Sequence, residues 1–183
     1  MRIEDGGGAN GDAKVNPNQQ LDTFSITEPE DKFNNRKGKL WSVTQATTPV
    51  GANDYVFYFK NTSNNETYAI TDIRVTAGAA TLLSVDYVAG VPTFTAGSDL
   101  TPVNRNLGSS VTITATIKEG TNTTGLTDQG RLFPIQVEAA NKMSHLRTTS
   151  NIIIPPGQAV AMESSAVTSV ESTWSFTVLE DDV

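Results

Sequence analysis

The chain has no cysteine, contains a single histidine and lacks any long apolar run. Without cysteine it can form neither a disulfide nor a thiolate metal site, and one histidine does not make a zinc centre. No stretch approaches the roughly eighteen apolar residues that a membrane-spanning helix needs, so we expect no membrane partner. The start of the sequence, Met1–Gly6, also lacks the apolar run of a signal peptide. We therefore expect a protein that is made in the cytoplasm and binds no metal.

Charged residues are scarce as well, at 18% of the 183 residues, and their balance is acidic. Thirteen Lys and Arg stand against twenty Asp and Glu, which gives a formal net charge of -7. Affinity for nucleic acid comes largely from Lys and Arg side chains that displace counterions from phosphates. The charge balance therefore argues against a nucleic-acid partner. Thr, Ser, Asn, Gly and Val are prominent instead, which is typical of strands and turns.

Glycine is concentrated near the N-terminus, where Gly6, Gly8 and Gly11 stand at the spacing G-x-G-x-x-G. A dinucleotide-binding loop with this spacing follows a hydrophobic strand and opens a helix. Neither pattern flanks these glycines, and the carboxylates of Asp5 and Asp12 would repel a phosphate. We therefore expect no nucleotide cofactor. The run is interpreted as part of an arm that can pass close to another backbone.

Residues 1–38 are predicted to form this extended N-terminal arm, a hairpin or hook, and one short helix. The start of the helix is indicated by a capping box, because Thr27 is followed three residues later by Glu30. The helix is expected to run to Lys37, and Gly38 is a typical stop signal.

From residue 39 onward the hydrophobic period is two, which indicates half-buried antiparallel strands. We predict one domain over 39–183, an all-β antiparallel sandwich for which a jelly roll is the favoured arrangement. Trp41 and Trp174 are expected to anchor its core. Pro134 cannot donate a ladder hydrogen bond, so its strand should lie at an edge or carry a bulge. The predicted strands cover 40–46, 55–59, 67–76, 81–89, 111–117, 133–137, 150–154, 157–163 and 173–178.

Two connections in this domain also carry expectations. Asn104 and Asn106 suit turn positions with a left-handed backbone, and Gly108 would free the chain to enter the next strand. Pro155-Pro156-Gly157 is predicted to form a rigid corner between two strands.

No arrangement of residues predicts catalysis. His145 lies in a segment without a nucleophile-elbow motif, so we expect a loop or strand-surface histidine and no enzyme. The carboxylates are scattered through turns and strand ends rather than paired. One basic cluster has two interpretations: it complements the dipole at the helix end, or it docks against an acidic partner. The cluster consists of Lys32, Arg36, Lys37 and Lys39.

Several stretches together resemble a group of structural proteins of tailed bacteriophages and their prophages. These stretches are the pattern Gly-x-x-Ala-Lys-Val-Asn-x-x-Gln-x-Leu from Gly11 to Leu21, Val103–Ser110, Asn151–Ala159, the strand end Phe59-Lys60-Asn61, and the closing strand with Trp174 and Phe176. The resemblance implies a part of a virion. Within that group, the acidic sandwich with an arm favours a capsid decoration (cement) protein, expected as a trimer and located in the virion.

The expected partner is the major capsid protein or another virion protein. The arm would bind it by strand addition or by threading between subunits, and several arms per oligomer would raise the affinity. The arm residues expected to bind are Arg2, Ile3, Gly6, Gly8, Gly11, Lys14, Val15, Leu21 and Phe24. Further interface residues are expected at Lys32, Arg36, Lys37 and Arg105.

Two other functions stay open at this point. The first is a neck, tail or fibre-attachment component of the virion that uses the same arm as an anchor. The second is a carbohydrate-binding or adhesion sandwich, which would need exposed aromatic side chains. Tyr58, Tyr68 and Tyr87 could serve, although we expect most of them to be interface or half-buried residues.

Overall fold

The computed structural model describes residues 30–179. The predictions for the glycine run, the hook and the capping threonine therefore lie outside the described residues. In chain order the elements are α1 (Glu30–Arg36), β1 (Leu40–Thr47), β2 (Asp54–Asn61), β3 (Thr67–Ala77), β4 (Thr81–Thr93), β5 (Ala96–Asp99), β6 (Val103–Asn104), β7 (Ala115–Thr121), β8 (Thr124–Val137), β9 (Ser144–Ile154), β10 (Ala159–Ser164) and β11 (Val170–Leu179).

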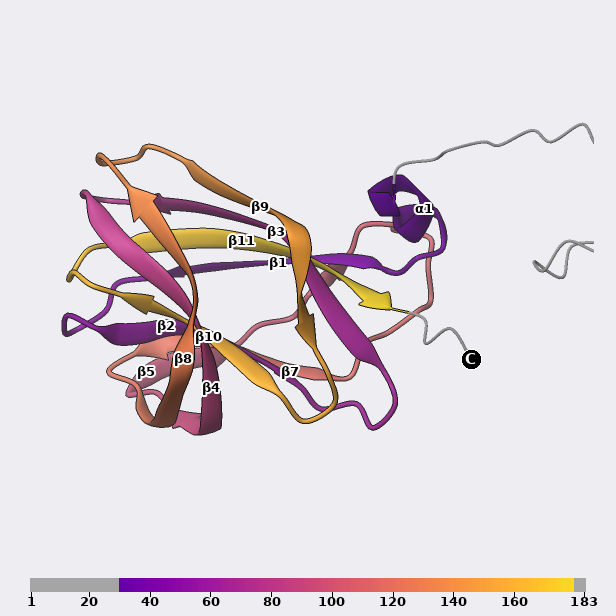
Figure 1. Ribbon diagram of the computed structural model, residues 1–183, viewed down its shortest axis with the longest axis horizontal. Coiled ribbons are helices and arrows are strands. Elements are labelled where there is room, and N and C mark those ends of the chain that lie inside the picture. Colours follow the sequence, from indigo (N-terminus) through magenta and orange to yellow (C-terminus); the bar gives the residue numbers. More distant parts are fainter. Residues whose placement is uncertain (1–29, 180–183) are drawn as a thin grey trace, which may run out of the picture. The chain divides into compact units, whose positions relative to one another are not determined.

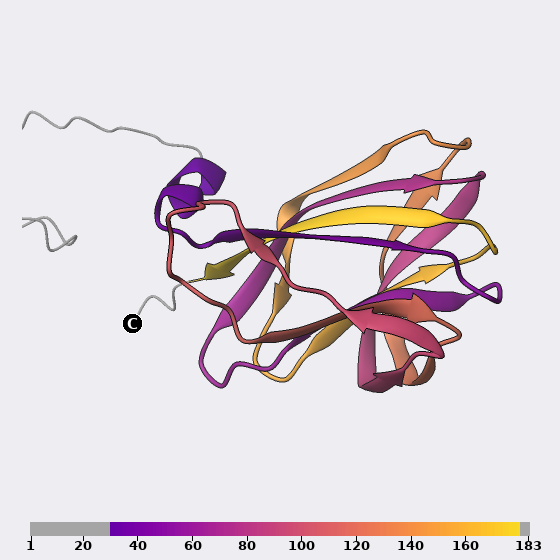
Figure 2. The same cartoon turned by 180° about the vertical axis from the view of Figure 1, so that it is seen from behind.

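The strands form two antiparallel sheets that face each other, as Figures 1 and 2 show from opposite sides. The five-stranded sheet has the order β6-β1-β11-β3-β9, and the six-stranded sheet has the order β5-β7-β2-β10-β4-β8. The expected all-β antiparallel sandwich with one short helix is confirmed.

The strand pairs follow a simple rule, because each early strand pairs with a late one. β1 pairs with β11, β2 with β10, β3 with β9, β4 with β8 and β5 with β7. This is the pairing of one long antiparallel ribbon. Its first four strand pairs alternate between the two sheets, and the fifth pair, β5 with β7, lies in the same sheet as β4 and β8. It supports the jelly roll, which stays a prediction finer than the confirmed sandwich.

Aromatic side chains from both sheets fill the space between the sheets. Trp174 of β11 stacks on Phe57 of β2 with ring centroids 4.4 Å apart, and Trp41 of β1 lies beside Phe176. Trp41 and Trp174 are 2% and 0% exposed, which confirms them as core anchors. Stacked and edge-on aromatic pairs add stabilisation beyond the apolar area that they bury.

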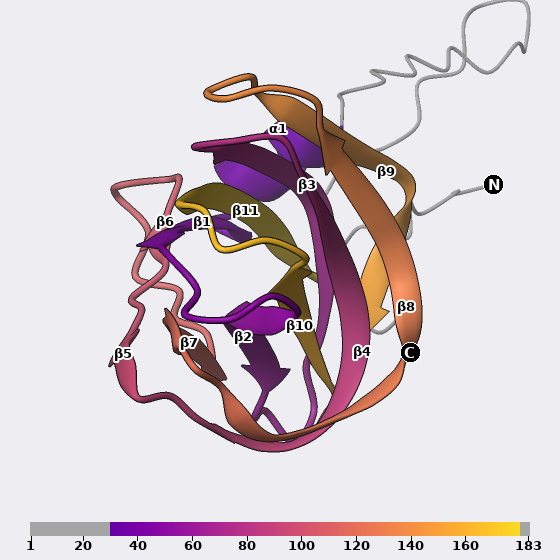
Figure 3. The ribbon, with the colours of Figure 1, turned by 90° about the vertical axis from the view of Figure 1, so that its left-hand side faces the viewer.

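The inner face of β2 and β10 packs on the five-stranded sheet, and their outer face is covered as well. Figure 3 shows the ends of β4 and β8 turning under these strands toward β5 and β7. Gly90 at this bend has a φ of +102°, and a Cβ added there would lie 2.2 Å from the carbonyl oxygen of Gly125. We call these four strands, β4, β5, β7 and β8, the bent ribbon. Phe94 and Leu126 lie within it and pack against a small buried cluster of Tyr58, Val88, Ala159 and Ala161.

Two local predictions about proline are confirmed. Pro134 lies in β8, which is an edge strand, and the register against β4 shifts between Val85 and Asp86. Between β9 and β10, the amide of Gln158 donates to the carbonyl of Pro155 over 3.2 Å, and Gly157 has a φ of +80°. Pro155-Pro156-Gly157 is thus the expected tight corner.

The predicted strand over 111–117 is wrong in its first half, because β7 begins only at Ala115. β2 ends at Asn61 opposite Ala115, so the preceding residues have no strand to continue the ladder. Side chains bind the backbone there instead. The amide of Thr114 donates to the hydroxyl of Tyr68 over 2.9 Å, and Asn104 Nδ2 donates to the carbonyl of Val111 over 3.4 Å.

Candidate interaction surfaces

The end of α1 is fixed by backbone hydrogen bonds that surround Gly38. The amide of Lys39 donates to the carbonyl of Asn34 over 2.8 Å, and that of Gly38 to Asn35 over 2.9 Å. Gly38 has a φ of +70°, so the helix ends in a Schellman motif. The predicted stop at Gly38 is confirmed, with the last helical residue at Arg36.

The loop after β6 is held against this helix end by two asparagines. Asn104 Nδ2 donates to the carbonyl of Gly38 over 2.8 Å, and Asn106 Nδ2 donates to that of Arg36 over 3.4 Å. Their Oδ1 atoms accept the amides of Asn106 and Gly108, each two residues further along. The expected left-handed backbone is wrong for this pair, because the positive φ values of non-glycine residues in the described part occur at other asparagines. The turn is made by the side chains.

This interlock brings residues far apart in the sequence onto one surface, which we call the helix-end surface: Phe33, Arg36, Lys37, Arg105 and Leu107. Leu107 is 89% exposed and Phe33 is 41% exposed. The Arg36 guanidinium and the Lys37 ammonium lie 5.7 Å and 5.4 Å from the ring centroid of Phe33. Apolar and cationic groups therefore stand together at the end of the sandwich that carries α1 (Figure 1).

The structure thus brings together part of the predicted interface. Arg36 lies in the last turn of α1, where a cation complements the helix dipole, and Lys32 is exposed on the same helix. The arm residues predicted to bind a partner all lie outside the described residues and stay predictions. They are Arg2, Ile3, Gly6, Gly8, Gly11, Lys14, Val15, Leu21 and Phe24.

Two of the three tyrosines considered for carbohydrate binding are buried, so neither can stack on a sugar. Tyr58 and Tyr68 are 1% and 0% exposed, because the bent ribbon covers the first and the core encloses the second. Burial raises the pKa of both hydroxyls. Tyr87 is exposed, and its hydroxyl donates to Gln158 Oε1 over 2.7 Å.

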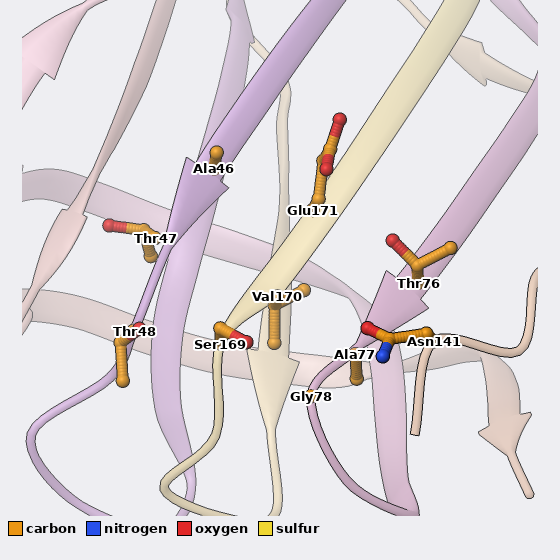
Figure 4. A pocket seen from close by; sticks show the side chains of 10 residues that line it. All are labelled: Ala46, Thr47, Thr48, Thr76, Ala77, Gly78, Asn141, Ser169, Val170 and Glu171. Carbon is orange, nitrogen blue, oxygen red and sulfur yellow. The ribbon is translucent and has the colours of Figure 1, made fainter. Parts of the chain in front are cut away.

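A polar groove of about 410 Å³ opens at the ends of the three central strands of the five-stranded sheet, where β1 ends, β3 ends and β11 begins. Figure 4 shows Glu171 of β11 standing between Ala46 of β1 and Thr76 of β3, with Asn141 beside Thr76. Register places Ala46 and Thr76 on either side of Glu171. The lining is completed by Thr47, Thr48, Ala77, Gly78, Ser169 and Val170.

A second group of polar residues lies beneath the bent ribbon. Asp86 of β4 is 1% exposed, and its Oδ2 accepts the Ser84 hydroxyl over 2.9 Å. Its Oδ1 lies 3.6 Å from Nε of Arg131 and accepts no hydrogen bond within the described part of the chain. Burial raises the pKa of Asp86, and burial likewise raises that of Glu163 on β10.

These two covered carboxylates are a group that sequence reasoning missed, because register across β4 and β10 brings them near each other. Shifted carboxyl pKa values are common at functional sites, but ion-pair networks shift them as well. Among residues 30–179 no set of three acidic or histidine side chains is placed to hold a metal ion. We therefore interpret Asp86 and Glu163 as a consequence of the ribbon cover.

His145 lies on the surface of β9, as expected. Its Nε2 is paired with a carboxylate oxygen of Asp72 on the neighbouring β3, and Nε of Arg74 binds the other oxygen over 3.0 Å. The His145 side chain is 37% exposed. The arrangement is that of a surface ion-pair network.

The described helix α1 is too short and too polar to cross a bilayer. No protein family matches the chain, and neither the curated proteins nor the solved structures contain a match. The resemblance to phage structural proteins therefore stays a prediction.

Proposed function

We propose that this chain is a non-enzymatic structural protein of a tailed-phage particle, a capsid decoration protein that attaches through its N-terminal region. The observation that supports the proposal is the helix-end surface. α1, which opens the described part of the chain, contributes Phe33 and Arg36 to this surface, Lys37 follows it directly, and the predicted arm precedes α1 in the sequence. The arm and this surface would act together on one partner.

The composition of the helix-end surface defines the partner that would fit it. Burial of a side chain such as Leu107 contributes about 1.5–3 kcal/mol, so Leu107 and Phe33 would supply most of the affinity. Arg36, Lys37 and Arg105 would surround them and favour an acidic surface, mainly by accelerating association. A partner with a shallow apolar pocket bordered by carboxylates, on the major capsid protein, is therefore proposed.

The first experiment asks whether the chain is in particles at all. Quantitative mass spectrometry of particles purified from the induced host should detect it at hundreds of copies per virion. Six or twelve copies would instead support the neck, tail or fibre-attachment function. Absence from purified particles would overturn both virion proposals.

The second experiment asks whether the helix-end surface is the contact. Full-length protein with Leu107→Ser, or with Arg36→Glu, Lys37→Glu and Arg105→Glu together, should bind particles lacking the native protein at least tenfold more weakly. The matched control is Lys118→Glu with Lys142→Glu, which reverses two cations of exposed ion pairs elsewhere. Equal binding by the control and the test variants would contradict the proposed surface.

A further inference from the structure

The polar groove at the ends of the central strands of the five-stranded sheet offers hydrogen-bonding groups that the protein itself does not use. Within the described part of the chain, the side chains of Thr48, Thr76, Asn141, Ser169 and Glu171 make no hydrogen bond or ion pair with another residue. They contribute hydroxyls, an amide and a carboxylate. The lining therefore contains donors as well as acceptors, and one negative charge.

The floor of the groove is hollow because two small residues lie among larger ones. Ala46 lies beside Glu171 in the register of β1 and β11, and Gly78 follows the end of β3. Gly78 contributes no side chain, and a Cβ there would lie 2.5 Å from the Ser169 hydroxyl oxygen, so a side chain at this position would push that hydroxyl aside. The small size of Ala46 and Gly78 thus leaves the hollow open.

Two of these polar side chains belong to strands, and the backbone of a third is hydrogen-bonded to a strand end. Thr76 and Glu171 belong to paired strands, and their backbones are directly opposite each other. Asn141 has a φ of +59°, and its amide donates to the carbonyl of Ala77 over 2.7 Å, which ties the β8–β9 connection to the end of β3. A ligand would therefore meet groups that are already in position, which limits the entropic cost of binding.

A shallower hollow continues the groove along the outer face of the sheet. It shares Thr76 and Glu171 and adds Met143, Arg74 and Thr173. Met143 is 61% exposed, so it offers an apolar surface next to the hydroxyls. Arg74 is engaged by Asp72 through its Nε atom.

We propose that this groove binds a neutral carbohydrate. Adjacent sugar hydroxyls both donate and accept, which suits a carboxylate with two acceptor oxygens beside an amide and several hydroxyls. The C–H face of the ring would lie on Met143. Glu171 disfavours an anionic ligand, and an apolar ligand would leave the hydroxyls and the carboxylate without partners. The volume of about 410 Å³ lies within the range of small-ligand sites. This inference does not rest on the virion proposal.

The test is a titration of the full-length ¹⁵N-labelled protein followed by NMR. The probes are maltose, cellobiose and methyl α-rhamnoside, with glucuronic acid as the anionic probe and 1,4-diaminobutane as the amine. At least one neutral sugar should shift the amides of Gly78, Asn141 and Glu171, with a Kd of about 1 mM, typical of a weak site. Glu171→Gln and Asn141→Ala should each weaken it about tenfold. Asp99→Asn, which removes an exposed carboxylate outside the groove, should leave the affinity unchanged.

Three results would overturn the proposal. The first is the absence of shifts at these amides with any neutral sugar. The second is binding of diaminobutane alone, which would show that Glu171 attracts an amine. The third is sugar binding that persists unchanged in both Glu171→Gln and Asn141→Ala, which would place the site elsewhere.

Discussion

The outer faces of the two sheets differ, although both point away from the space between them. In the five-stranded sheet this face is open and polar around Thr44 and Thr173, whose hydroxyls are hydrogen-bonded across β1 and β11 over 3.1 Å. In the six-stranded sheet the corresponding face carries Tyr58 and Ala161, which are 1% and 0% exposed. The bent ribbon of β4, β5, β7 and β8 covers it (Figure 3). A sandwich face can therefore be a second core rather than a solvated surface.

This difference accounts for where functional groups are available. On the open face, Glu171 and Thr76 can meet a ligand. On the covered face, the carboxylate of Asp86 is enclosed, and its hydrogen-bonding capacity is only partly used. The same residue types thus have different consequences on the two faces, because only one is shielded from water.

Truncation on the covered face should have the largest effect. We expect Tyr58→Ala to lower the free energy of unfolding by about 3–5 kcal/mol, as for a large aromatic side chain in a core. Tyr58→Phe, which removes only the hydroxyl that donates to the carbonyl of Gly90 over 3.2 Å, should lower it by about 1 kcal/mol. Urea unfolding followed by circular dichroism measures both. If Tyr58→Ala lowers the free energy of unfolding by less than about 1 kcal/mol, the outer face is not a second core.

The connection between β7 and β8, within the bent ribbon, should be the next most sensitive point. Asp54 accepts the amide of Thr123 over 2.7 Å and that of Asn122, where the chain passes from β7 to β8 with a φ of +50° at Asn122. We expect Asp54→Ala to lower the free energy of unfolding by about 2–3 kcal/mol, because two backbone amides of the connection lose the carboxylate that accepts them both. Retained stability together with unchanged amide exchange at Thr123 would contradict this function of Asp54.

The covered carboxylate should have a smaller effect that depends on pH. Burial raises the pKa of Asp86 in the folded state above its ordinary value of 3.8, so the folded state binds this proton more readily than the unfolded chain. The associated stability is complete below the unfolded value and is lost as pH rises through the folded value. The stability of the native protein relative to Asp86→Asn should therefore increase as pH falls from about 7 to about 4.

An exposed carboxylate provides the comparison for this measurement. Lys142 hydrogen-bonds to Glu138 and holds its pKa below the usual value, so its contribution has the opposite pH dependence. The stability relative to Glu138→Gln should be flat or decrease as pH falls. A flat difference for Asp86→Asn over the same range would mean that Asp86 is not shielded. Asp86 is also faced by other titratable or charged groups, namely Asp128, Arg131, Tyr55 and Glu163. The comparison therefore changes one residue at a time and leaves these groups in place.

Much of the fold could be predicted from the sequence, because it depends on local patterns. Alternation over 55–59 and 173–178 marks strands that pack on the core, and Gly38 ends the helix as its position indicates. The pattern failed at 111–114, where alternating residues have no neighbouring strand. Alternation describes side chains, but a strand also requires a partner for its backbone.

The candidate sites were less predictable because they depend on contacts between distant segments. Nothing near Glu171 in the sequence indicates that Thr76 and Asn141 lie beside it. The pairing of β3 with β11 and the hydrogen bond from the Asn141 amide to Ala77 bring them together. Alternation predicts that Tyr58 points away from the face that carries Phe57 and Phe59, but it does not show that other strands cover Tyr58. The residues of the bent ribbon that pack on Tyr58 include Phe94 and Leu126. In the sequence, only glycines such as Gly90 and Gly125 mark the place where this ribbon bends.

The smallest effect is expected on the open face. Thr173→Ala removes the hydrogen bond to Thr44, but the remaining hydroxyl of Thr44 can bind water instead, so the free energy of unfolding should change by less than about 0.5 kcal/mol. The same urea titration used for Tyr58 measures it, and the m-value should stay constant because no buried surface is lost. A loss of more than about 1 kcal/mol would mean that this face is covered too, by a second copy of the chain. Repeating the measurement at tenfold lower protein concentration separates the two cases, since stability supported by association falls on dilution and that of an open face does not.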